Sequence, residues 1–150
     1  NNTFLGAILY RYTLKAKEKN IKMNSDIRDK CIEGIDEMTI TTILYNLLDN
    51  AIENCGGESP FINISIQKKN DSYVNINILN RSVKKPVQNK YGDFISDKQD
   101  KAMHGLGLKS IKSTIKKNGG EFSAYYSPED KVFHAVAILY VEKKYESNNM

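Results

Sequence analysis

The most regular hydrophobic pattern of the chain lies between Asp36 and Gly57. Apolar residues recur there at three- and four-residue steps, which is typical of one face of an amphipathic helix. These residues are Ile40, Ile43, Leu44, Leu47, Leu48, Ala51, Ile52 and Cys55. Asp36 is the predicted N-cap, and the helix is predicted to end at Cys55-Gly56-Gly57.

A polar stripe follows the same steps on another side of this helix and contains Asn46, Asn50 and Glu53. Asparagine is a poor helix former because its short amide competes for backbone hydrogen bonds. The stripe is therefore either a solvated face or a functional surface whose role compensates for the lost helix stability.

Two further stretches have helical periodicity. Residues 2–19 carry an apolar stripe, with lysines in the last turns, where the helix dipole favours them. The stripe consists of Phe4, Leu5, Ile8, Leu9, Tyr12 and Ala16. Leu108, Ile111 and Ile115 mark a second helix, which is predicted to end at Asn118-Gly119-Gly120.

Five stretches predict strands, the first of them irregular. They are residues 21–32, 61–67, 73–79, 121–126 and 132–141. The second and third alternate apolar and polar residues around Asn70-Asp71 and predict an antiparallel hairpin with one apolar face. Because the strands are segregated from the helices and joined as hairpins, the predicted fold class is an α+β two-layer sandwich with helices on one face.

Residues 81–103 contain few apolar residues and no sustained period, and such segments are usually functional or mobile. They lead to His104-Gly105-Leu106-Gly107, a glycine turn that runs directly into the helix of Leu108. Glycines at a helix start let the backbone approach an anion, and the free amides with the helix dipole attract phosphate. Taken alone, a G-x-G is more often a plain turn.

The asparagine helix and the glycine turn together resemble two motifs of a known family. N-L-L-D-N-A-I-E (residues 46–53) and H-G-L-G-L-K-S-I-K (residues 104–112) are similar to the N box and G2 box of the GHKL ATPases, which include gyrase, MutL and histidine kinases. More narrowly, the pattern resembles the ATP-binding domain of sensor histidine kinases of the quorum-sensing, Agr/VirS-like type. The resemblance covers nearly the whole chain. It implies the Bergerat fold, with a mixed, mostly antiparallel sheet, a long ATP lid formed by residues 81–103, and ATP and Mg²⁺ as cofactors.

This resemblance assigns roles to the polar stripe. Asn50 matches the asparagine that coordinates magnesium, a hard cation that takes oxygen ligands beside substrate phosphates. Asn46 matches a position that in gyrase and MutL looks like a water-activating glutamate. An amide cannot act as a general base, so Asn46 favours transfer to a protein acceptor over hydrolysis. Asn46 and Asn50 are the candidate catalytic residues, while Glu53 and Asn54 either extend the ATP site or form a solvated face.

The remaining ATP-binding candidates come from the third strand and the glycine turn. Asn80 stands where related domains carry the aspartate of D-x-G-x-G, and it is expected to accept a hydrogen bond from the adenine amino group. The chain reads Asn80-Arg81-Ser82 there and lacks the glycines. The other candidates, which would contact or neutralise the phosphates, are Lys98, His104, Gly105, Leu106, Gly107 and Leu108.

Three aromatic residues are less clearly assigned. Tyr91 and Phe94 are either packing anchors of the lid or nucleotide contacts. His134 lies in a strand pattern and is expected to be an ordinary residue at the edge of the core.

Composition narrows the classes of function. The chain has 150 residues, of which 40% are hydrophobic and 27% charged, as in an ordinary soluble domain. Neither a long apolar span nor a signal peptide is expected. The two cysteines have no metal-ligand spacing and are expected to be reduced thiols. The net charge of +4 raises nucleic-acid binding as a possibility, but attraction of nucleotide phosphates explains the basic loop equally well.

The resemblance thus implies the catalytic domain of a two-component sensor histidine kinase. It would transfer the γ-phosphate of Mg-ATP to a histidine on a separate helical domain, with a response regulator as a further partner and no nucleic acid. Residues 1–20 would be the linker after the phosphoacceptor helices, residues 21–142 the catalytic domain and residues 143–150 a disordered tail. We expect a monomer or weak dimer from the cytoplasmic part of a membrane-anchored bacterial protein. The alternative is a degenerate nucleotide-binding or scaffolding domain without kinase activity, which the missing D-x-G-x-G motivates.

Overall fold

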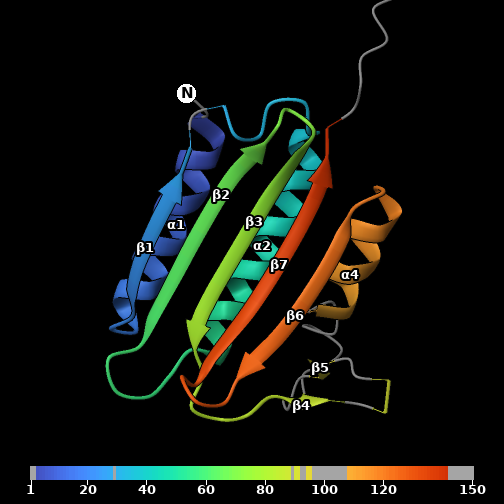
Figure 1. The fold of residues 1–150 in the computed structure, drawn as a ribbon. Coiled ribbons are helices and arrows are strands. Elements are labelled where there is room, and N and C mark those ends of the chain that lie inside the picture. The colour runs from blue at the N-terminus through green and yellow to red at the C-terminus, as the bar shows by residue number, and fades with distance from the viewer. Residues whose placement is uncertain (1–2, 29, 89, 92–93, 96–107, 142–150) are drawn as a thin grey trace, which may run out of the picture.

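The computed structural model describes residues 3–28, 30–88, 90–91, 94–95 and 108–141 as a sheet covered on one face by helices (Figure 1). The sheet has the order β1-β2-β3-β7-β6. Its strands are β1 (Lys22–Ile27), β2 (Phe61–Lys69), β3 (Tyr73–Arg81), β6 (Glu121–Ser127) and β7 (Val132–Tyr140). β1 runs parallel to β2, and every other neighbouring pair is antiparallel. In the described part of the chain, the helical layer consists of α1 (Thr3–Glu18), α2 (Glu37–Asn54) and α4 (Leu108–Lys117), with α2 in the middle. The predicted α+β two-layer sandwich is confirmed.

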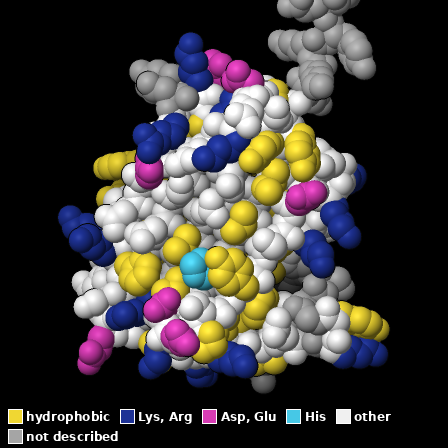
Figure 2. Space-filling view, viewed as in Figure 1, with side chains coloured by type: hydrophobic (Ala, Val, Ile, Leu, Met, Phe, Trp, Pro, Cys, Tyr) yellow, Lys and Arg dark blue, Asp and Glu magenta, His cyan; other side chains and the backbone are white. Residues whose placement is uncertain are grey.

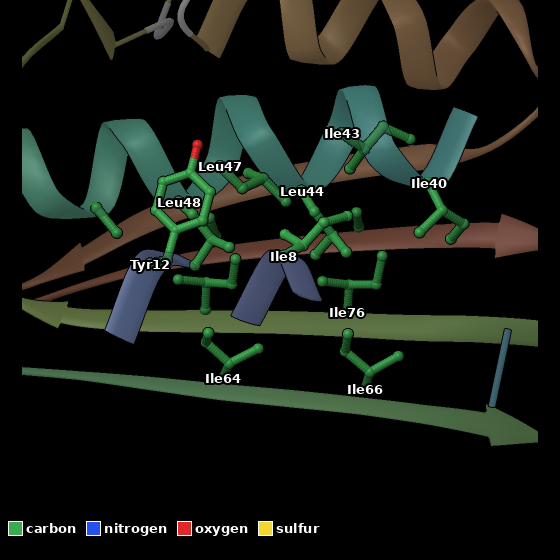
Figure 3. Close-up of a cluster of buried hydrophobic side chains, with 14 of the residues drawn as sticks. Ile8, Tyr12, Ile40, Ile43, Leu44, Leu47, Leu48, Ile64, Ile66 and Ile76 are labelled. Carbon is green, nitrogen blue, oxygen red and sulfur yellow. The ribbon is translucent and has the colours of Figure 1, made fainter. Parts of the chain in front are cut away.

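The core between the two layers is built around α2, as its hydrophobic pattern predicts. Asp36 caps the helix: its Oδ2 accepts hydrogen bonds from the backbone N–H of Thr39 at 3.0 Å and from the Thr39 hydroxyl at 3.1 Å. The seven predicted apolar residues from Ile40 to Ile52 are all buried. Figure 3 shows five of them facing isoleucines of β2 and β3 and the buried side of α1: Ile40, Ile43, Leu44, Leu47 and Leu48.

The hairpin of β2 and β3 has the predicted alternation, with one face buried under the helices and the other open. Its turn is made by Asn70 and Asp71, whose φ angles of 52° and 53° are left-handed. Asparagine and aspartate tolerate this conformation better than other non-glycine residues. The open face of the sheet carries hydrophobic side chains among polar ones (Figure 2).

Two helices end in the same hydrogen-bonded motif. Ile21 N–H donates to the Ala16 carbonyl at 2.8 Å, and the intervening Asn20 has a φ of 57°. After α4, Gly120 N–H donates to the Ile115 carbonyl at 2.8 Å, and Gly119 has a φ of 78°. Both are Schellman motifs, in which a left-handed residue satisfies the last helical carbonyls. The predicted ends of the two helices are therefore confirmed.

Two predicted boundaries are wrong. The first strand spans Lys22–Ile27 rather than residues 21–32, because the register with β2 covers only these residues and the chain then turns toward α2. Residues 81–103 are not uniformly irregular. β3 extends through Arg81, and β4 (Val87–Gln88) pairs with β5 (Phe94–Ile95) as a separate ladder. Strands of two residues are too short to produce a periodic signal.

Among the described residues, no helix is long and apolar enough to cross a membrane. The predicted tail at residues 143–150 lies outside the described residues.

Candidate functional site

Three segments that carry predicted site residues meet at one end of the sandwich. α2 ends at Asn54, and the chain then enters β2, in which Ile62 pairs with Asn80 near the end of β3. α4 ends where β6 begins, and this connection lies at the end of the sheet opposite to Asn54 and Asn80. The first residue of α4, Leu108, therefore lies at the same end as Asn54 and Asn80 (Figure 1). The fold therefore gathers segments that are separated by up to 54 residues in the chain (Asn54 to Leu108).

The polar stripe of α2 lies on the flank turned away from α1. Tyr45 and Asp49 are the α2 residues that contact α1 through hydrogen bonds. Asn46 and Asn50 each follow one residue later, which places them about 100° further around the helix. Asn46, Asn50 and Glu53 are partly exposed. They are therefore accessible from the side of the helical layer where α2 contacts α4.

Asn50 and Asn54 are joined by their side chains. The Nδ2 group of Asn54 donates to Oδ1 of Asn50 at 3.0 Å and to its backbone carbonyl at 2.8 Å. A carbonyl oxygen has two lone pairs, so Oδ1 of Asn50 retains one for a further partner. An amide oxygen that is held in place and keeps a free lone pair is a suitable ligand for Mg²⁺. This residue therefore fits the implied metal, and Asn54 orients it.

Asn80 is a buried polar residue on the face of the sheet that packs against the helices. Its side chain is 1% exposed, between the apolar positions of the neighbouring strands. Its Nδ2 group donates to the Arg81 carbonyl at 3.2 Å. The amide oxygen thus remains the atom that can accept from an adenine amino group.

The two aromatic residues of the lid segment behave differently. Phe94 of β5 lies edge-on against Phe133, with ring centroids 5.0 Å apart and an interplanar angle of 86°. Phe133 pairs with Asn80 in the sheet, so Phe94 packs beside the end of β3. Tyr91 is 76% exposed and has the ammonium group of Lys90 5.0 Å from its ring centroid. Phe94 is thus a packing anchor in this structure.

Ser82 anchors the beginning of the lid segment and was not found by sequence reasoning. It is buried, and its carbonyl accepts a hydrogen bond from the Tyr126 hydroxyl at 2.7 Å. Its N–H donates to the Lys131 carbonyl at 2.8 Å, and its hydroxyl donates to the Lys84 carbonyl at 2.9 Å. The sequence contained one signal for this contact, the alternation along β6 that places Tyr126 on the inner face of the sheet. The pairing with Ser82 itself could not be predicted, because partners 44 residues apart follow no local pattern.

The phosphate side of the predicted site is described only from Leu108 onward. Lys98, His104, Gly105, Leu106 and Gly107 lie outside the described residues. Leu108 begins α4 and packs against the core, and α4 has no acidic residue in its first turn. No acidic side chain in the first turn of α4 offsets the partial positive charge at the start of this helix. That charge favours the binding of an anion there.

His134 lies on the open face of the sheet, opposite the face that carries Asn80, and pairs with Leu79 of β3. It stacks on Tyr125 with ring centroids 4.3 Å apart and an interplanar angle of 9°. Burial lowers the pKa of His134 below its usual value, and nearby Asp130 opposes this shift. The expected position at the edge of the core is wrong, because alternation along β7 turns His134 to the face opposite the core, where it is half-buried beside Tyr125.

The fold and the arrangement of these segments define a Bergerat-type sandwich, with amide side chains of α2 and β3 and the start of α4 gathered at one end. A family model described as the GHKL domain matches residues 35–139, so the chain belongs to the GHKL domain family.

Solved structures of histidine kinases share this fold. The catalytic domain of histidine kinase ThkA has a TM-score of 0.66 at 21% identity, over 91% of this chain and 94% of that one. The mycobacterial sensor histidine kinase MprB has a TM-score of 0.61 at 13% identity, over 91% of this chain and 95% of that one. The Acinetobacter baumannii histidine kinase AdeS has a TM-score of 0.63 at 16% identity, over 93% of this chain and 66% of that one. At these identities the likeness establishes the fold alone. No curated protein matches the sequence.

Proposed function

We propose that this chain is the catalytic, ATP-binding domain of a two-component sensor histidine kinase that acts in peptide quorum sensing. It binds Mg-ATP and transfers the γ-phosphoryl group to a histidine of a separate helical domain, from which a response regulator takes it. The N-box and G2-box sequences support the assignment to histidine kinases of the quorum-sensing type. The GHKL fold supports ATP as the bound nucleotide.

The observation that carries this proposal is the convergence of Asn50, Asn80 and the start of α4 at one end of the sandwich. Asn80 offers a buried acceptor for the base, and Asn50 offers an amide oxygen that is held by Asn54. The start of α4 offers a partial positive charge for phosphates. These three chemistries match the three parts of a metal–nucleotide complex.

The residues of this chain act by binding and orientation. Mg²⁺, held by Asn50 and the phosphates, would supply charge neutralisation as the phosphoryl group moves. Asn46 is an amide and cannot take a proton from water, which disfavours hydrolysis as a competing reaction. The γ-phosphoryl group moves from ATP to a nitrogen of the acceptor histidine: the bond from the γ-phosphorus to the bridging oxygen breaks, a P–N bond forms, and ADP leaves. Positioning of the two reactants therefore supplies most of the rate enhancement.

The proposal is tested by mixing the purified domain with the helical segment of the same kinase and ATP labelled at the γ-phosphate. We expect label on the acceptor histidine of that segment, and none when the histidine is replaced by glutamine. The assignment would be refuted if the full-length kinase is active but the isolated domain transfers no label at a saturating concentration of the helical segment.

The second candidate, a nucleotide-binding or scaffolding domain without kinase activity, is favoured by one observation. The strand end reads Asn80-Arg81-Ser82 where related domains carry D-x-G-x-G, and Ser82 is buried and hydrogen-bonded instead of forming an open glycine turn. Thermal-shift titration separates the candidates, because a bound ligand stabilises the folded state by mass action. No shift at millimolar Mg-ATP supports the scaffold, whereas a shift without phosphotransfer supports the nucleotide-binding domain.

A further inference from the structure

α1 and α2 are joined by a contact that lies outside the proposed ATP site. The Tyr12 hydroxyl donates to Oδ1 of Asp49 at 2.8 Å and lies 3.4 Å from the Tyr45 backbone carbonyl. The Lys15 ammonium lies 3.9 Å from the same Asp49 oxygen and 4.9 Å from the centroid of the Tyr12 ring. We call Tyr12, Lys15, Tyr45 and Asp49 the α1–α2 latch.

The hydroxyl of Tyr12 is not needed to fill the core. The side chain is 1% exposed, and its ring packs among core side chains and 5.7 Å from the Tyr45 ring (Figure 3). Phenylalanine would fill the same space. Burial raises the pKa of Tyr12, and the hydrogen bond to Asp49 raises it further, so the phenol remains a donor at neutral pH. The hydroxyl therefore serves to connect the two helices.

The latch holds the same turns of α2 that carry the polar stripe. Asp49 stands between Asn46 and Asn50 in the sequence, and the flank that binds α1 is adjacent to the flank that carries the two asparagines. A rotation of α2 by about 10° moves an atom about 5 Å from its axis by roughly 1 Å. Displacements of this size have large effects on a precisely oriented group. A hydrogen bond from α1 to the flank of α2 opposes this rotation.

We propose that Tyr12 and Asp49 are positioning residues that fix the rotation of α2 and thereby the direction of the Asn50 amide oxygen. Mg²⁺-dependent nucleotide binding then depends on the docking of α1, and a movement of α1 would change the affinity at the site. This inference rests on the proposed function.

The test compares Tyr12→Phe with Tyr10→Phe, a matched control on the same helix whose side chain is 67% exposed. Dissociation constants for ATP are measured by calorimetry, well below the melting temperature, with Mg²⁺ and with EDTA. Tyr12→Phe should weaken binding with Mg²⁺ by about three- to tenfold and leave binding in EDTA unchanged, while Tyr10→Phe changes neither. Equal losses in both conditions, or a lowered melting temperature with unchanged affinity, would indicate a merely structural tyrosine and overturn the proposal.

Two variants of Asp49 test the hydrogen bond itself. Asp49→Asn keeps an acceptor oxygen, so its dissociation constant for Mg-ATP should lie within about twofold of the wild-type value. Asp49→Ala has no acceptor, so its loss of affinity should equal that of Tyr12→Phe. If the contact is the cause, the double variant Tyr12→Phe/Asp49→Ala is no weaker than either single variant. Additive losses would contradict the latch.

If the nucleotide-binding part of the proposed function fails, the result is different, because wild type would then not bind Mg-ATP at all. In that case hydrogen exchange of residues 45–54 decides whether the latch holds α2. Faster exchange in Tyr12→Phe than in Tyr10→Phe supports the restraint, and equal exchange overturns it.

Discussion

Replacing Asn50 by alanine separates a metal ligand from a structural residue. The substitution removes the Asn54–Asn50 side-chain hydrogen bond of 3.0 Å, but Asn54 is exposed and keeps its 2.8 Å bond to the Asn50 backbone carbonyl. The freed amide is solvated, so the loss costs little. Alanine is the better helix former by up to about 0.7 kcal/mol. We therefore expect a free energy of unfolding without ligand that is unchanged or higher by about 0.7 kcal/mol.

Binding should change in the opposite direction. Loss of an oxygen that binds a cation should weaken Mg-ATP binding by at least about tenfold, since hydrogen bonds to charged groups contribute about 1.5–3 kcal/mol. Thermal melts of wild type and variant, with and without Mg-ATP, measure both effects. Thr42→Ala, at an exposed position of the same helix, is the control that gains helix propensity alone. An apo melting temperature clearly below that of wild type, or an undiminished shift with Mg-ATP, would refute the ligand role.

Three further predictions concern the fold. Asp36→Ala removes the cap on Thr39 and should lower the free energy of unfolding by about 1 kcal/mol in urea titrations; an unchanged midpoint would contradict the cap. Gly120→Ala places a methyl group against a carbonyl oxygen of β7 and should cost about 1–3 kcal/mol. In contrast, Gly6→Ala in α1 meets nothing within 4 Å and should add up to about 1 kcal/mol; equal stabilities of these two variants would show that the contact is absent. Burial lowers the pKa of His134, so the unfolded chain binds its proton first as pH falls through about 6.5. Stability should therefore decrease from pH 7 to 5 more in wild type than in His134→Gln, and parallel pH profiles would exclude the shift.

Local structure was largely predictable because local interactions decide it. The α2 helix follows from its three- and four-residue apolar steps and from Asp36, whose carboxylate needs only the amide three residues on. The β2–β3 hairpin follows from alternation on either side of Asn70-Asp71. The shorter first strand and the β4–β5 ladder were missed, because pairing partners rather than sequence pattern set their lengths.

The candidate site was predictable only in part. Asn46, Asn50 and Asn80 were identified by motif, and their roles remain predictions. That Asn80 is 1% exposed on the inner face, and that Asn54 holds the Asn50 oxygen, are features that the motif does not contain. The hydrogen bond from Tyr126 to Ser82 links residues that no short-range pattern connects.

The sequence by itself determined which segments become helices and strands and which faces are buried, since periodicity and caps act over a few residues. Only the tertiary structure decided which segments meet. β7 lies between β3 and β6, so the end of β3 and the start of α4 reach the same end of the sandwich as the end of α2. Tyr12 meets Asp49 across 37 residues. The physical reason is that such contacts form when distant apolar faces are buried together, and their partners are then chosen by the packing of the whole core.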